Sequence, residues 1–218
     1  MLRLTFNLPP GQPLNILCIG AHSDDIEIGA GGTILALLAQ PRPVRVHWIV
    51  FSASPQRAQE ARASAAEFLT GADAALIEVE DMRDGFFPAE FLRVKERFEV
   101  LKQASRPDLI LTHTRDDHHQ DHRCLAELTW NTFRKHLILG YEIPKYDPDL
   151  GNPNLFMPLS SEVAERKVAA LMRHFKTQHA RGWFTPETFH ALMRLRGLQA
   201  AAQSGMAEAF HGPKLWLC

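Results

Sequence analysis

Short apolar runs alternate along this chain with stretches in which apolar residues recur at helical spacing. Residues 14–19 (LNILCI) form a near-continuous apolar run, which is typical of a strand buried on both faces. Similar runs predict further strands at residues 44–51, 75–79, 109–112 and 137–143. Helical spacing predicts helices at residues 28–38, 55–69, 90–104, 122–135, 161–175 and 187–202. These repeated strand–helix units predict an α/β fold over residues 1–218, namely a single doubly wound, Rossmann-like domain with a mostly parallel sheet flanked by helices.

The chain changes character after residue 143. Residues 144–158 are rich in Pro, Asp, Asn and Gly, which predicts a loop or an insertion. The wider segment 141–158 either shapes the mouth of a binding site or is a surface excursion, and the sequence leaves both interpretations open. A short last strand is expected at residues 214–217.

The composition excludes several classes of protein. Apolar residues make up 45% of the chain, which is enough for a sizeable core and too many for a disordered protein. The 24 basic and 25 acidic side chains leave a net charge of −1, which argues against nucleic acid as a partner. No signal peptide is recognisable and no apolar run is long enough to span a membrane, so we expect a cytoplasmic protein without membrane insertion. Cys18, Cys124 and Cys218 suggest no disulfide framework, and a homo-oligomer remains open.

Two polar clusters follow predicted strands directly. Residues 20–25 (GAHSDD) come after the first strand, and residues 113–122 (HTRDDHHQDH) come after the fourth. Because ligands of doubly wound sheets bind beyond the carboxyl ends of the strands, we expect the two clusters to meet there. Neighbouring carboxylates are costly to desolvate unless a cation lies between them. The clusters therefore indicate a metal site.

His22, Asp25 and His122 are the candidate ligands. Three nitrogen or oxygen ligands with an open fourth position are typical of catalytic zinc, although two histidines and a carboxylate also suit Fe²⁺. Each part of these polar clusters also has a simpler interpretation. Asp24 or Asp25 would serve equally well as a helix cap, and the pair at residues 118–119 as a solvated turn. Residues 29–32 (GAGG) lie inside a predicted helix, where close packing explains them better than phosphate binding.

The residues also carry a resemblance to a known family. Residues 21–35 (AHSDDIEIGAGGTIL) resemble the AHPDD-x-E-x-x-x-GGT signature of the LmbE-like (PIG-L) family of zinc-dependent N-deacetylases. Residues 118–123 (HHQDHR) resemble that family's second signature, H-x-DH. Weaker matches are Arg57-x-x-Glu60, Asp84-Gly85 and residues 207–210 (AEAF), so that the resemblance covers about residues 14–212.

The resemblance implies a role for each matching residue. His22, Asp25 and His122 would hold one divalent metal, and Asp24 would be the general base that takes a proton from the attacking water. A protonated His119 would stabilise the oxyanion and protonate the departing amine, and Asp121 would orient it. Arg57 and Asp84 match positions that face the sugar in relatives.

Two positions depart from the family pattern. Ser23 stands where the family usually has proline, which relaxes the turn between the ligand and the base. Asp117 stands where some relatives carry an aromatic hydroxyl that assists the oxyanion, so that this assistance is either missing or supplied elsewhere.

The resemblance implies a small-molecule substrate with an N-acetylglucosamine-type group, which amide hydrolysis would convert to acetate and a free amine. Three alternatives remain open. A metal-dependent phosphoesterase would need further carboxylate ligands, and Asp73, Asp81 and Asp108 do not form a convincing set. A catalytically silent sugar-binding protein would keep the site without turnover. A nucleotide-binding enzyme would need a Gly-rich turn where residues 22–25 lie.

Overall fold

A mixed sheet of seven strands forms the centre of the computed structural model, which describes residues 3–215. The strands are β1 (Leu14–Gly20), β2 (Val44–Val50), β3 (Ala74–Val79), β4 (Leu109–His113), β5 (Leu137–Tyr141), β6 (Leu155–Leu159) and β7 (Met206–His211). Their order is β3-β2-β1-β4-β5-β7-β6, and β1 to β5 run parallel while β7 is antiparallel to both of its neighbours. The predicted α/β fold with a mostly parallel sheet is confirmed.

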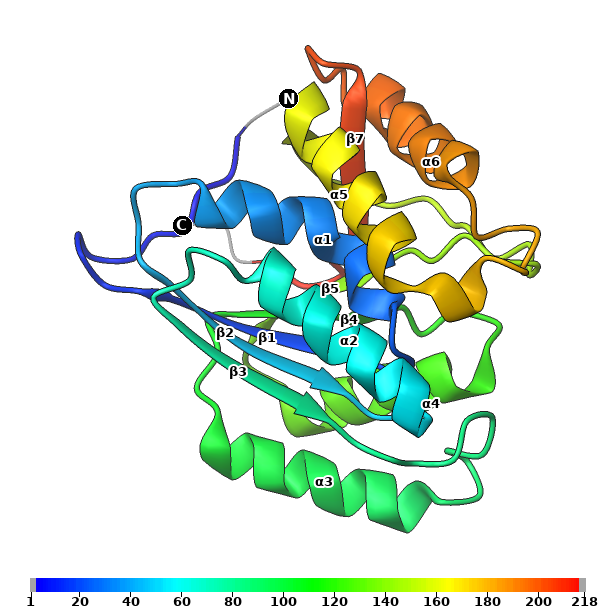
Figure 1. Ribbon diagram of the computed structural model, residues 1–218. Helices are drawn as coiled ribbons and strands as arrows, with labels where there is room; N and C mark the ends of the chain where they lie inside the picture. Colours follow the sequence, from blue (N-terminus) through cyan, green and yellow to red (C-terminus); the bar gives the residue numbers. More distant parts are fainter. Residues whose placement is uncertain (1–2, 216–218) are drawn as a thin grey trace.

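Helices cover both faces of this sheet. They are α1 (Asp25–Leu38), α2 (Pro55–Phe68), α3 (Phe91–Ala104), α4 (Gln120–Thr132), α5 (Ser161–His174) and α6 (Pro186–Gln199), with a short 3₁₀ turn η1 at Lys176–Gln178. Helices α3 and α4 lie on one face, and α1, α2 and α5 lie on the other (Figure 1). Each face buries its own apolar cluster, as expected for strands buried on both sides. Within residues 3–215, none of the helices is long and apolar enough to span a membrane.

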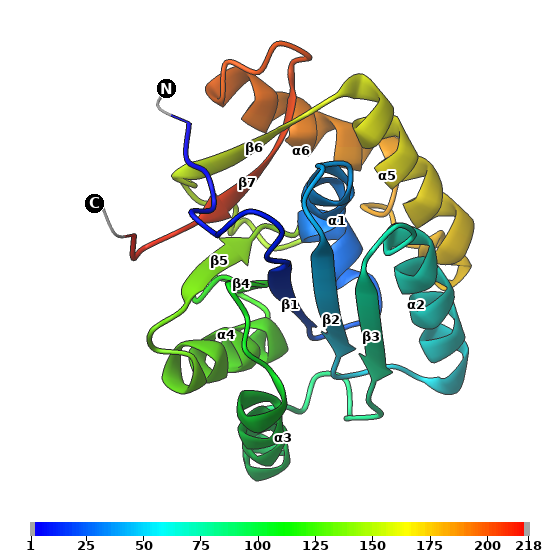
Figure 2. The same ribbon diagram turned by 90° about the vertical axis from the view of Figure 1, so that its left-hand side faces the viewer.

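The structure corrects two expectations near the C-terminal end. The segment 144–158 is not all loop, because β6 begins at Leu155 and pairs with β7 at the edge of the sheet, beside α6 (Figure 2). Pro158 can lie in β6 because an edge strand has one side without ladder hydrogen bonds. The last strand is β7, at residues 206–211. Lys214 and Leu215 are not in a strand, and the rest of the expected strand at 214–217 lies outside the described residues.

The glycines of α1 allow it to pack closely on its neighbours. A Cβ atom at Gly29 would lie 2.2 Å from the ring of Tyr141, and one at Gly31 would lie 2.6 Å from the ring of Phe68. Glu208 of β7 accepts hydrogen bonds from the backbone N–H of Gly32 (2.8 Å) and of Thr33 (2.6 Å). Close packing, rather than phosphate binding, therefore explains this glycine-rich stretch.

Replacing Gly29 with alanine is expected to destabilise the fold by about 1–3 kcal/mol, because the buried Tyr141 ring must move. Urea denaturation followed by circular dichroism measures this change. The matched control is Gly182→Ala, where the nearest atom would lie 3.7 Å away and little change is expected. A Gly29→Ala protein as stable as its parent would show that the helix packs less tightly than described.

Candidate metal centre

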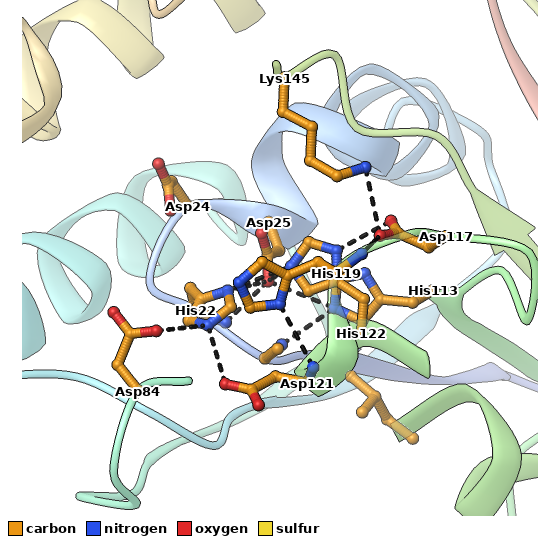
Figure 3. Close-up of polar contacts among 12 residues, drawn as sticks. His22, Asp24, Asp25, Asp84, His113, Asp117, His119, Asp121, His122 and Lys145 are labelled. Atoms are coloured by element: carbon orange, nitrogen blue, oxygen red, sulfur yellow. Dashed lines mark hydrogen bonds and ion pairs between the residues drawn. The ribbon is translucent and has the colours of Figure 1, made fainter. Parts of the chain in front are cut away.

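The two polar clusters meet at the carboxyl edge of the sheet. Strands β1 and β4 are adjacent and parallel, so that the turn after β1 and the loop after β4 leave the sheet side by side. His22 lies in that turn, Asp25 begins α1, and His122 lies in the first turn of α4. About a hundred residues of sequence separate the two groups, and their side chains converge on one point (Figure 3).

The three predicted ligands form a compact triangle of atoms. His22 Nδ1 lies 3.1 Å from His122 Nε2 and 3.4 Å from Asp25 Oδ2, and the third side, from His122 Nε2 to Asp25 Oδ2, is 3.5 Å. Ligands about 2.0–2.1 Å from a tetrahedral zinc ion are separated by about 3.3–3.4 Å. All three side chains are buried. The donor set and its spacing therefore fit a divalent metal.

The electrostatics of the cluster also favour a cation. Burial alone would lower the pKa of His22, but Asp25 and the neighbouring Asp121 and Asp84 raise it well above its ordinary value. His122 differs, because burial and the adjacent His113 lower its pKa to about 4 and keep it neutral. A metal-ligating imidazole must be neutral. Three carboxylates therefore surround His22, and a bound metal would supply a positive charge that balances them.

Asp117 contacts His122, one of the three candidate ligands. Its Oδ2 atom lies 2.8 Å from His122 Nδ1, and its Oδ1 accepts a hydrogen bond from the backbone N–H of His119 (2.8 Å) and lies 3.2 Å from Lys145 Nζ. A carboxylate on the far nitrogen of a histidine is the usual support of a metal ligand, since it fixes the ring and its tautomer. Asp117 therefore orients the His122 ring, a role that its position in the sequence did not reveal.

Neutralising Asp117 is expected to weaken metal binding about ten- to a hundredfold, because Asp117→Asn removes the negative charge behind His122. Competition with a chromogenic zinc chelator measures the affinity. Asp116→Asn, one residue earlier and exposed, is the matched control. Equal zinc affinities for the two variants would contradict this role.

His113, at the end of β4, also contacts the cluster, which its position in the sequence did not reveal. Its Nε2 atom lies 3.2 Å from Asp25 Oδ2, and its ring stacks on His122 with 3.9 Å between centroids. The backbone N–H of Ala21 donates to the same Nε2 atom (3.0 Å). His113 thus ties the tip of β4 to the turn after β1.

Asp24 lies beside the ligands and faces the cavity. It precedes the first residue of α1, but its side chain makes no capping hydrogen bond, and Asp25 Oδ2 instead accepts the backbone N–H of His22 (2.7 Å). The helix-cap interpretation therefore does not explain either carboxylate. Burial raises the pKa of Asp24, while the guanidinium of Arg57, which donates to its Oδ1 at 2.7 Å, opposes that rise.

His119 and Asp121 lie at the start of α4, beside the candidate ligands. His119 Nδ1 accepts a hydrogen bond from the backbone N–H of Asp121 (3.3 Å), and burial lowers its pKa, so the ring is neutral with its proton on Nε2. The carboxylate of Asp121 instead accepts from the backbone N–H groups of Gly85 (2.6 Å) and Phe87 (3.1 Å). Asp121 therefore acts on His119 through its backbone and its charge, not through a side-chain hydrogen bond.

A cavity of about 210 Å³ opens over the cluster. Asp84 lines it with a side chain that is 61% exposed, and its Oδ1 lies 3.1 Å from His22 Nε2. The other lining residues are His22, Asp24, Asp25, Arg57, His119, His122, Ile143, Lys145, Tyr146, Asp147, Gln178, Arg181 and Trp183. Four of these belong to the segment 141–158, so that part of this segment lines the cavity.

The remaining candidates lie elsewhere. Asp73 pairs with Arg45, Asp81 pairs with Arg93, and Asp108 accepts hydrogen bonds from Asn15, so that these carboxylates are not available as ligands of a second metal here. His118 is exposed, and its backbone N–H donates to Asp149.

Comparisons with known proteins agree with this geometry. The family model PIG-L, described as GlcNAc-PI de-N-acetylase, matches residues 17–133, which include both polar clusters. A comparison with curated proteins finds no match.

Several solved structures share the fold. The conserved protein TT1542 from Thermus thermophilus is 21% identical with a TM-score of 0.69, covering 94% of this chain and 97% of that one. GalB, the 4-carboxy-2-hydroxymuconate hydratase from Pseudomonas putida, is 18% identical with a TM-score of 0.73, covering 94% and 98%. The N,N'-diacetylchitobiose deacetylase from Pyrococcus horikoshii is 20% identical with a TM-score of 0.66, covering 90% and 82%. With more than half of its length matched by the family model, the chain belongs to the PIG-L (LmbE-like) family of metal-dependent deacetylases.

Proposed function

We propose that this protein is a zinc-dependent hydrolase that removes the acetyl group from an N-acetylated sugar and releases acetate and a free amine. The substrate class is a glycoconjugate, nucleotide sugar or related small molecule with an N-acetylglucosamine-type group. The observation that carries the proposal is the triangle of His22, Asp25 and His122 beside a buried carboxylate, Asp24, on one cavity. Fe²⁺ is the alternative metal, because two histidines and a carboxylate suit it too.

A zinc ion held by these three residues would polarise the acetyl carbonyl and lower the pKa of the attacking water toward about 7.

Asp24 takes the proton of the attacking water. Its burial raises the pKa of the carboxyl, and a base is most effective when its pKa approaches the working pH. The hydrogen bond from Arg57 to Oδ1 fixes the carboxylate in place. Once protonated, Asp24 can return this proton to the departing amine.

His119 stabilises the oxyanion. In its neutral form, with Nδ1 occupied by the backbone N–H of Asp121, it offers a single N–H donor at Nε2. A donor of this kind typically contributes about a hundred- to a thousandfold in rate. The resemblance implies a protonated His119 as the acid for the departing amine; because Nδ1 accepts from the backbone, we propose that Asp24 supplies this proton.

The fold alone does not separate amide hydrolysis from other reactions of activated water, since one of the similar structures is named as a hydratase. The family description supports deacetylation, and so does a cavity that combines a base with an oxyanion donor.

A panel of substrates tests the proposal. Zinc-loaded and chelated protein are incubated with N-acetylglucosamine, a nucleotide sugar that carries the same group and an N-acetylglucosaminyl lipid, and released acetate is measured. We expect acetate from at least one compound with the zinc-loaded protein and none after chelation. Binding without acetate release would favour the silent sugar-binding protein, and phosphate release would favour the phosphoesterase.

A further inference from the structure

Part of the lining of the cavity comes from two segments outside the cluster of candidate metal ligands. One segment, residues 143–147, follows β5, and the other, residues 178–183, begins at the last residue of η1. The two segments approach each other at the rim, because a Cβ atom at Gly182 would lie 3.7 Å from the hydroxyl oxygen of Tyr146. We call residues 178–183 the outer wall.

The carboxylate of Glu60, on α2, binds the residue that precedes the outer wall. Glu60 accepts hydrogen bonds from the backbone N–H of Thr177 (3.0 Å, to Oε1) and from its hydroxyl (2.5 Å, to Oε2). Thr177 is followed directly by Gln178, which is buried and lines the cavity. Glu60 also lies one helical turn after Arg57, the residue that holds Asp24. Helix α2 therefore positions both the catalytic carboxylate and the outer wall.

The side chains of the outer wall are suited to binding a saturated ring that carries hydroxyl groups. Trp183 supplies a large aromatic face, and Gln178 and Arg181 supply planar hydrogen-bonding groups. Tyr146 adds a second aromatic ring at the rim, where it is 74% exposed. Aromatic rings bury apolar area, while a few placed polar groups fix the orientation of a ligand. A saturated ring with hydroxyl groups presents both an apolar face and polar edges.

We propose that the outer wall determines substrate specificity by binding the ring that bears the acylated amine, and that Glu60 is its positioning residue. The proposal rests on the proposed deacetylase function. It assigns Trp183 and Arg181 to substrate contact, and it assigns Glu60 to the shape of the wall and not to the chemistry.

Glu60→Ala tests the positioning role, with Glu67→Ala as the matched control. Glu67 lies two turns further along α2 and also accepts hydrogen bonds from a neighbouring element, from Arg173 and His174 of α5, but neither of those residues lines the cavity. We expect Glu60→Ala to raise hydrogen exchange in residues 176–183 and to raise KM for N-acetylglucosamine about tenfold, with kcat within about twofold of its parent. Glu60→Gln, which keeps one oxygen acceptor, should restore part of the change. Equal exchange and KM in the Glu60 and Glu67 variants would overturn the proposal.

Trp183→Ala tests the contact with the ring. The ratio of kcat/KM for N-acetylglucosamine to that for N-acetylethanolamine, which lacks a ring, should fall about tenfold or more. Trp130→Ala is the control, because Trp130 lies on α4 outside the cavity. An unchanged ratio in Trp183→Ala would contradict the assignment.

Equilibrium binding of glucosamine separates this proposal from the proposed function. If the parent protein releases acetate from no compound of the panel, the deacetylase proposal fails while the outer wall is still tested. Glucosamine binding should weaken about tenfold in Glu60→Ala and Trp183→Ala and stay unchanged in both controls. A parent protein that does not bind glucosamine, or variants that bind it equally well, would refute the outer wall as a ring-binding surface.

Discussion

Replacing His122 with alanine is expected to abolish both zinc binding and acetate release. His122 Nε2 is one of three atoms that lie 3.1–3.5 Å apart, and two ligands hold a metal far less firmly than three. The transition state loses several kcal/mol of charge stabilisation with the metal, so that activity should fall by at least about a thousandfold. Elemental analysis of the purified variant and an acetate assay measure the two losses.

His118→Ala is the control for this variant. His118 lies in the same loop, but its side chain is exposed and does not belong to the ligand cluster. It should keep the parent's zinc content and activity. A His122→Ala protein that retained one tightly bound zinc ion per chain and its activity would show that the metal centre lies elsewhere.

Replacing Asp24 with asparagine is expected to lower kcat by about 10²–10⁴-fold while zinc remains bound. An amide has nearly the shape of a carboxylate and can still accept a hydrogen bond from Arg57, but it cannot take up the proton of the attacking water. The zinc ligands are unchanged in this variant. Steady-state kinetics together with the zinc content separate the loss of the base from the loss of the metal.

Asp116→Asn removes an exposed carboxylate from the second loop and should leave kcat unchanged. If Asp24→Asn turned over substrate as fast as the parent with a full complement of zinc, another group would have to be the base. An Asp24→Asn protein without zinc would instead place Asp24 among the groups that hold the metal.

The sequence predicts the central strands β1 and β4 well because parallel strands buried on both faces appear as continuous apolar runs. It also predicts β2, β3 and β5 from their apolar residues, although β3 is an edge strand whose residues are exposed or half-buried. It does not predict β6 and β7. Strand β6 is short, contains Pro158 and begins inside a segment rich in turn residues, and β7 (MAEAFH) mixes small, polar and aromatic side chains. These two strands depend on pairing with each other at the edge of the sheet, which no local pattern records.

The sequence likewise predicts only part of the candidate site. His22, Asp25 and His122 could be found because they flank adjacent strand ends, and the structure brings them together. The residues that support this cluster, Asp117 and Lys145, could not be predicted, because their contacts depend on the direction in which their side chains point. Asp117, five residues before His122, turns back toward that ring. Lys145 approaches Asp117 from a loop after another strand, which no spacing within the second cluster reveals.

Asp121 shows the limit of carrying roles along a motif. The resemblance implied that Asp121 orients His119, without naming the atoms involved. Because His119 caps the start of α4, the backbone N–H of Asp121 reaches the imidazole, while its carboxylate points to the turn at residues 85–87. The proximity was expected, but the atoms that make the contact follow from helix geometry.

The central claim is that one ion is shared by the tips of β1 and β4. An anomalous difference map from a crystal of the zinc-loaded protein, measured at the zinc edge, tests it most directly. We expect one strong peak about 2.0–2.2 Å from His22 Nδ1, Asp25 Oδ2 and His122 Nε2. A peak held by other residues, or no peak within reach of these three atoms, would contradict it.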